Sequence, residues 1–89
     1  MSLEKILKEV SLGSTNKTHR FYPEKSNWRF LIQKNKLKTE NKIIFYYLVV
    51  AFNLRIKKAK ESNCKSIKEL RTFIKETIRK EGWLSCRLI

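Results

Sequence analysis

The chain has 89 residues, and its 21 Lys and Arg against 8 Asp and Glu give a formal net charge of +13. At this length it forms one domain over residues 1–89, without a separate linker. An apolar fraction of 42%, with two Trp, three Tyr and five Phe, excludes a disordered chain. Because so much like charge destabilises a compact state, the composition predicts a polyanionic partner that offsets it.

The charge is distributed unevenly along the chain. Residues 1–24 carry four basic and three acidic side chains, and residues 25–42 carry six and one. Residues 43–54 carry neither kind, and residues 55–89 carry eleven and four. An uncharged run therefore separates two strongly basic regions.

Few residues suit catalysis or metal binding. The chain has no Asp, a single imidazole, His19, and two cysteines, Cys64 and Cys86. A disulfide-stapled secreted domain has more cysteines, and a zinc site needs closely spaced ligand pairs. No nucleotide-binding or nucleophile motif occurs. These observations predict a protein that is not an enzyme, holds no metal or cofactor, and works in the reducing cytoplasm.

No membrane segment is expected. Residues 1–12 mix charged and apolar residues and lack the apolar stretch of a secretory signal. As a helix, the uncharged run 43–54 would span about 18 Å, whereas a bilayer core is about 30 Å thick. This run is therefore expected to lie in the protein core.

The first expected element is an amphipathic helix over residues 3–11, begun by Ser2 and ended by Gly13. Residues 13–23 are rich in Ser, Thr and Asn and end in a proline, so a surface loop carrying His19 is expected there.

A second helix is expected over residues 27–37, capped by Ser26. Trp28, Phe30 and Ile32 in this segment also alternate as they would in a strand, and that alternative stays open.

A third helix is expected over residues 40–62, capped by Thr39. Its first half is apolar on every side, so it needs surrounding protein, which in so short a chain indicates self-association. The same run is rich in β-branched and aromatic residues, as buried strands are. Because no Gly, Pro, Asn-Gly or Asp-Gly interrupts residues 42–61, a helix is favoured.

The strongest local signal is a capping box, Ser66-Ile67-Lys68-Glu69. It predicts a last helix that ends near Glu81, before Gly82, and is followed by an extended tail beginning at Trp83. The predicted fold class is therefore all-α, a small bundle of three to four helices with a central apolar helix. The alternative is an α+β fold with residues 28–34 and 43–52 as strands.

Basic residues on the last helix align at helical spacing, apart from Glu69 and Glu76. Like charges four residues apart cost a few tenths of a kcal/mol, a cost that a bound polyanion would reverse. This basic ridge consists of Lys68, Arg71, Lys75 and Arg79. A second basic cluster consists of Arg55, Lys57, Lys58 and Lys60, and a third group of Arg29, Lys34, Lys36, Lys38 and Lys42. The candidates for stacking on bases are Trp28, Trp83, Phe21 and Tyr22, which lie near basic residues.

The predicted function is sequence-independent binding of DNA or RNA through phosphate contacts, by a free protein or within a ribonucleoprotein, with a homodimer as the expected state. The first alternative is a small inhibitor or adaptor of a virus or mobile element that binds an acidic protein surface. The second is attachment to an anionic membrane surface through the last helix.

Overall fold

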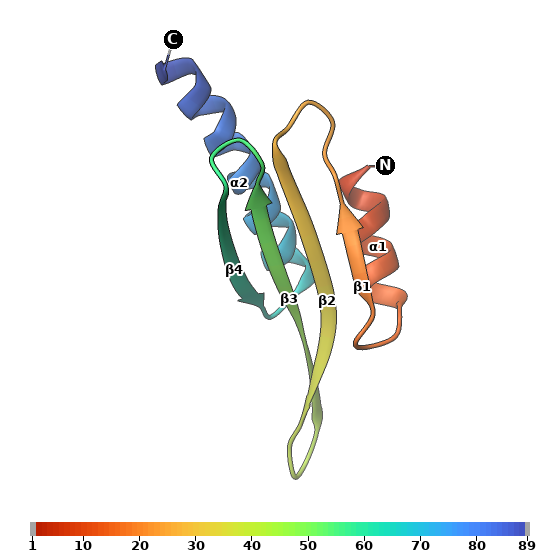
Figure 1. The fold of residues 1–89 in the computed structure, drawn as a ribbon. Coiled ribbons are helices and arrows are strands. Elements are labelled where there is room, and N and C mark those ends of the chain that lie inside the picture. Colours follow the sequence, from red (N-terminus) through yellow and green to blue (C-terminus); the bar gives the residue numbers. More distant parts are fainter. Residues whose placement is uncertain (1, 89) are drawn as a thin grey trace.

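The computed structural model of the protein describes the backbone of residues 2–88 and the side chains of residues 2–80. Along the chain, one helix comes first, four strands follow, and a second helix comes last (Figure 1). The elements are α1 (Leu3–Leu12), β1 (Thr18–Phe21), β2 (Trp28–Lys38), β3 (Ile43–Asn53), β4 (Lys58–Cys64) and α2 (Ile67–Leu88). The strands form one antiparallel sheet in the order β1-β2-β3-β4, so every connection within the sheet is a hairpin.

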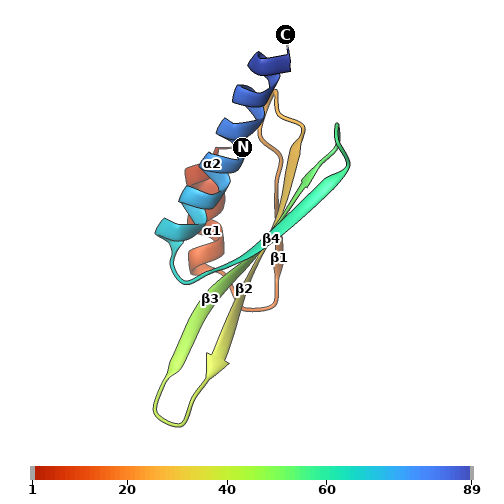
Figure 2. The ribbon, with the colours of Figure 1, turned by 90° about the vertical axis from the view of Figure 1, so that its left-hand side faces the viewer.

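Both helices lie on the same face of the sheet (Figure 2). Helix α1 contacts β1 and β2, whereas α2 contacts β2, β3 and β4. The core fills the layer between the helices and the sheet. Its fully buried side chains are Phe30, Leu7, Ile32, Leu70, Ile74, Val10, Val49 and Thr77.

The predicted all-α bundle is wrong, and the α+β alternative describes the fold. Both strands of that alternative are longer than expected, and the apolar run lies in β3. Along β3 the side chains of Tyr47, Val49, Ala51 and Asn53 are buried, while those between them are exposed or half-buried. A helix that is apolar all round must be covered on every side, whereas a strand in this sheet is covered by helices on one side only. Two helices are enough to cover one side of this sheet.

The residues expected to cap the second and third helices instead shape loops. Ser26 Oγ accepts a hydrogen bond from the backbone N of Trp28 at 3.1 Å, at the entry to β2. Thr39 closes the β2–β3 hairpin, because its backbone N and its Oγ1 both donate to the carbonyl of Lys42, at 2.9 and 2.8 Å. Ser and Thr bond to nearby backbone in turns as readily as at helix starts, so their presence alone does not distinguish the two.

The β3–β4 turn is also built without glycine. Asn53 Oδ1 accepts from the backbone N of Arg55 at 2.9 Å and of Ile56 at 3.2 Å. Lys57 then takes the left-handed conformation, with φ 54°. An asparagine side chain that bonds to the backbone two residues on mimics a turn. The absence of glycine between residues 42 and 61 was therefore no evidence for a continuous helix.

Helix α1 confirms the first expected element. Ser2 Oγ accepts from the backbone N of Lys5 at 3.2 Å, and Gly13 follows the last turn. A Cβ at Gly13 would lie 2.8 Å from the carbonyl oxygen of Glu9, which is closer than side-chain carbons approach backbone. Only glycine, which has no Cβ, fits at residue 13, and the helix ends there.

Helix α2 begins as the capping box predicts. Ser66 Oγ accepts from the backbone N of Glu69 at 3.2 Å, and the Glu69 carboxylate accepts from the backbone N of Lys65 at 2.7 Å. The helix does not stop before Gly82 but continues to Leu88, so the expected extended tail is wrong. The side chain of Trp83 lies outside the described side chains.

His19 is not on a surface loop but buried in β1, with only 8% of its area exposed. Its Nε2 has no hydrogen-bond partner among the described residues. Burial, and to a lesser degree the charge of Lys17, lowers the pKa of the imidazole, while Glu9 acts in the opposite direction. The folded protein therefore favours the neutral form of His19 more strongly than the unfolded chain does.

This burial predicts that acid destabilises the fold below about pH 6.5, the ordinary pKa of histidine. Above that pH the imidazole is neutral in both the folded and the unfolded protein, so its titration does not lower the free energy of unfolding. As the pH falls below it, the unfolded chain binds a proton more readily than the folded chain, so the free energy of unfolding drops, with an upper limit of about 1.4 kcal/mol per pH unit for one proton. Urea unfolding at pH 7, 6 and 5 measures this loss. A His19→Gln variant should lose less stability over the same interval, and an equal loss in both proteins would contradict the prediction.

Candidate nucleic-acid interface

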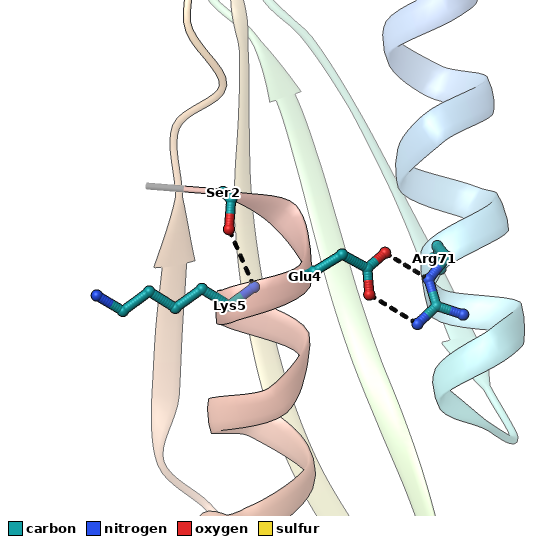
Figure 3. Close-up of polar contacts among 4 residues, drawn as sticks. All are labelled: Ser2, Glu4, Lys5 and Arg71. Atoms are coloured by element: carbon teal, nitrogen blue, oxygen red, sulfur yellow. Dashed lines mark hydrogen bonds and ion pairs between the residues drawn. The ribbon is translucent and has the colours of Figure 1, made fainter.

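The predicted basic ridge of α2 is only partly available. Lys68, Lys75 and Arg79 are exposed, but Arg71 is half-buried and bound to Glu4 of α1. Arg71 Nε donates to Glu4 Oε1 at 2.8 Å, and Nη2 donates to Oε2 at 2.9 Å (Figure 3). This hydrogen-bonded pair lowers the pKa of Glu4 and raises that of Arg71. Arg71 therefore joins the two helices and interrupts the ridge.

The second predicted cluster does not lie on a helix. Its residues form the β3–β4 turn and the first part of β4, where Arg55, Lys57 and Lys58 are exposed and Lys60 is half-buried. The β1–β2 loop lies at the same end of the sheet, since the backbone N of Leu54 donates to the carbonyl of Asn27 at 2.9 Å.

That loop adds a basic residue that the sequence did not place in any site. Lys25 is exposed and has φ 58°. No local pattern connects it with residue 55, because the pairing of β2 with β3 and the hydrogen bond from Leu54 to Asn27 bring the two loops together. In residues 22–27 and 54–60, which build this end, Glu24 is the only acid. We call the following five residues the basic end: Lys25, Arg55, Lys57, Lys58 and Lys60.

Lys60 connects the basic end to the core and to α2. Its Nζ lies 5.4 Å from the ring centroid of Trp28 and 5.2 Å from that of Phe73. Burial lowers the pKa of Lys60, the charge of Lys80 on α2 lowers it further, and Glu76 opposes both effects. Two like charges are thus held near each other at the point where α2 passes this end of the sheet.

The aromatic side chains expected to stack on bases are placed differently. Trp28 is only 9% exposed, and Lys60 lies over its ring, so the ring offers little surface to a base in this structure. Its ring sits 6.4 Å from that of Phe30 within the core. The side chain of Trp83 lies outside the described region. Tyr22, by contrast, is 52% exposed, and the Arg29 guanidinium lies 5.3 Å from its ring centroid.

The third basic group lies largely on an arm, residues 35–46, formed by the distal part of the β2–β3 hairpin. The arm projects past the helices at the end of the sheet opposite the basic end (Figure 1). Lys36 pairs across the strands with Phe45, and Lys38 pairs with Ile43, and all four are exposed. This face of the arm therefore alternates basic and apolar side chains.

Lys34, at the base of the arm, has a structural role. Its Nζ donates to the carbonyls of Ser11 at 2.7 Å and Gly13 at 3.5 Å, and lies 4.8 Å from the Phe45 ring centroid. A cation at these carbonyls complements the negative end of the α1 dipole.

Metal-binding and nucleophilic groups are sparse in the described region. No three His, Cys, Asp or Glu side chains among the residues that the structure describes are arranged to hold a metal ion. Cys64 is buried, and burial raises the pKa of its thiol. A buried thiol of raised pKa is a poor nucleophile. Neither described helix is long and apolar enough to cross a membrane.

Searches of known protein families, of curated proteins and of solved structures find no match to this chain.

Proposed function

We propose that this is a non-enzymatic nucleic-acid-binding protein that contacts phosphates without reading base sequence. The observation that carries the proposal is the basic end, where two loops distant in sequence bring four exposed basic side chains together with one acid. A solvated surface usually intersperses charges of both signs, because like charges repel. A phosphate chain would remove this repulsion.

The charges where the basic end meets α2 support the same proposal. Lys60 and Lys80 repel each other, and Glu76 offsets their repulsion only in part. A nearby phosphate would stabilise both ammonium groups, and the counterions released from the nucleic acid would add affinity that is independent of sequence.

The exposed lysines of the arm offer a second contact region. Lys36, Lys38 and Lys42 lie near the hairpin turn, whereas the basic end lies at the opposite end of the same two strands. At about 3.4 Å per residue, the paired 11-residue strands separate the two regions by about 34 Å. A single strand of nucleic acid with one phosphate every 3.4 Å or more spans this distance with roughly ten nucleotides.

Fluorescence anisotropy tests the proposal with labelled 30-residue single-stranded DNA, single-stranded RNA and duplex DNA. At low salt we expect binding to at least one of them, with similar affinity for two unrelated sequences. If about five phosphates are contacted, the logarithm of the affinity should fall against the logarithm of salt with a slope of about −4 to −5. If none of the three binds at 50 mM salt, the proposal is wrong, and an acidic protein partner becomes the better explanation of the charge.

A further inference from the structure

The sheet face opposite the helices is uncovered by any element of the described chain (Figure 2). We call it the open face. Its centre is apolar and comes from β2 and β3. Leu31 is 42% exposed, Leu37 56%, Ile44 41% and Phe52 39%, and the side chains of Tyr46, Leu48 and Val50 between them are half-buried. A contiguous apolar face of this kind is uncommon on a soluble monomer and marks an interaction surface.

The antiparallel register arranges the open face in rows that run across the sheet. The central row is Arg20, Leu31, Val50 and Glu61, one residue from each strand. It begins with a cation, ends with an anion and is apolar between them. The row nearer the arm is Thr18, Gln33, Leu48 and Asn63, and the arm adds the pairs Asn35–Tyr46 and Leu37–Ile44.

We propose that a second copy of this chain packs on the open face, related by a two-fold axis parallel to the strands. This rotation keeps each row at its level and reverses its order, so that β1 lies over the partner's β4 and β2 over the partner's β3. Sheets packed face to face keep their strands within about 30° of each other, which this arrangement satisfies.

The reversal makes the face complementary to itself. Arg20 faces the partner's Glu61, and Glu61 faces the partner's Arg20, at the two margins. Between them Leu31 lies over the partner's Val50. In the arm, Leu37 lies over the partner's Ile44, and at the other end of the face Phe52 lies over the partner's Arg29. The exposed aliphatic residues of this face are therefore covered by aliphatic residues of the partner. The lysines Lys36 and Lys38 point to the other face of the arm and stay accessible.

A two-fold axis perpendicular to the strands fits the same residues poorly. It places β1 over the partner's β1, so that Arg20 would face the partner's Arg20 and Glu61 the partner's Glu61. The two arms would also point in opposite directions, leaving Leu37 and Ile44 uncovered. Charge and apolar coverage therefore both select the axis parallel to the strands.

A nucleic acid is a less suitable occupant of the open face. The central side chains of the open face are mainly aliphatic, whereas base stacking uses exposed aromatic rings. The cation Arg29 is already engaged, because its Nη1 donates to the carbonyls of Ser26 at 2.8 Å and Trp28 at 2.9 Å. The remaining cation, Arg20, is balanced on the same row by Glu61.

Sedimentation equilibrium between 1 and 200 μM protein tests the dimer. The rows offer fewer residues than the roughly 20–30 that a standard interface has on each side, so we expect a micromolar dissociation constant. Each chain carries a net charge of +13, so screening the repulsion between copies should tighten the dimer as salt rises from 50 to 300 mM. Nucleic-acid binding is expected to weaken over the same salt range. Failure of the dimer proposal can therefore be told apart from failure of the proposed nucleic-acid binding.

A charge exchange tests the axis. Arg20→Glu should weaken the dimer about three- to tenfold, although it lowers the net charge that opposes association, because it places like charges opposite each other twice. Adding Glu61→Arg restores the original net charge and should return the dissociation constant to within about twofold of the original. Lys8→Glu on α1, which changes the net charge equally but lies on the helix side, should not weaken the dimer.

Leu31→Thr with Val50→Thr tests the apolar centre while keeping residues that favour strands. We expect at least tenfold weaker association with an unchanged circular dichroism spectrum. If these two threonine substitutions unfold the chain, the charge exchange between Arg20 and Glu61 alone tests the proposed dimer. A protein that is monomeric at 200 μM in 300 mM salt, or a dimer unaffected by Arg20→Glu, would overturn the proposal. Loss of nucleic-acid binding in the threonine variant of a monomeric protein would assign the open face to nucleic acid instead.

Discussion

Removing the charge of the basic end is expected to weaken nucleic-acid binding at least about 100-fold at 100 mM salt. The variant combines Lys25→Asn, Arg55→Gln, Lys57→Asn and Lys58→Gln. Each phosphate that this variant no longer neutralises should make the slope of log affinity against log salt about one unit less steep. Asparagine is chosen at residues 25 and 57 because both have positive φ, which asparagine tolerates. Lys60 is kept because it packs on Trp28 and Phe73.

A matched variant separates the basic end from the net charge of the protein. Lys5→Gln, Lys8→Gln, Lys17→Gln and Lys65→Gln also remove four charges, from exposed residues outside the basic end. Its affinity should fall less than about tenfold, and its salt slope should stay steep, because long-range effects between exposed charges are screened. Equal losses in the two variants would show that binding follows total charge, and the basic end would then have no special role.

The largest expected loss of stability comes from Leu7→Ala in α1. Leu7 is 1% exposed and belongs to the cluster that packs α1 on the sheet. Truncating a buried leucine removes apolar burial and leaves a cavity, at a cost of about 2–5 kcal/mol. A domain of this length has a total stability of about 4–13 kcal/mol. Urea unfolding followed by circular dichroism should show a much lower midpoint at an unchanged slope.

Leu12→Ala supplies the control in the same helix. Leu12 is 77% exposed, and alanine has the highest helix propensity, so the change should alter stability by less than about 0.5 kcal/mol. Similar losses from the two substitutions would mean that α1 does not pack on the sheet through the face that carries Leu7.

The secondary structure could be predicted where it depends on neighbouring residues. Helix α1 follows from Ser2, from the spacing of Ile6, Leu7 and Val10, and from Gly13, all within one segment. The capping box likewise places the start of α2. The apolar run in β3 is ambiguous because it is apolar at both helical and strand spacing. Its pairing with β2 and β4, which lies beyond any local window, decides that it is a strand.

The candidate site could be predicted only in part, for the same reason. The cluster from Arg55 to Lys60 is visible in the sequence as a run of basic residues. Arg71 has the spacing of an exposed ridge residue, yet its partner Glu4 lies 67 positions away. Trp28 lies near basic residues in the sequence, as a stacking ring would, but alternation along β2 turns its ring into the core.

The sequence by itself determines that the protein is strongly basic, short of catalytic residue types, and built with helices near the start and the end of the described chain. These properties depend on composition or on residues within a few positions of each other. Only the tertiary structure decides that Lys25 joins the basic end, that Arg71 is occupied by Glu4, and that one face of the sheet stays uncovered. Each of these depends on strand register and helix packing, which bring together residues whose separation along the chain carries no local signal.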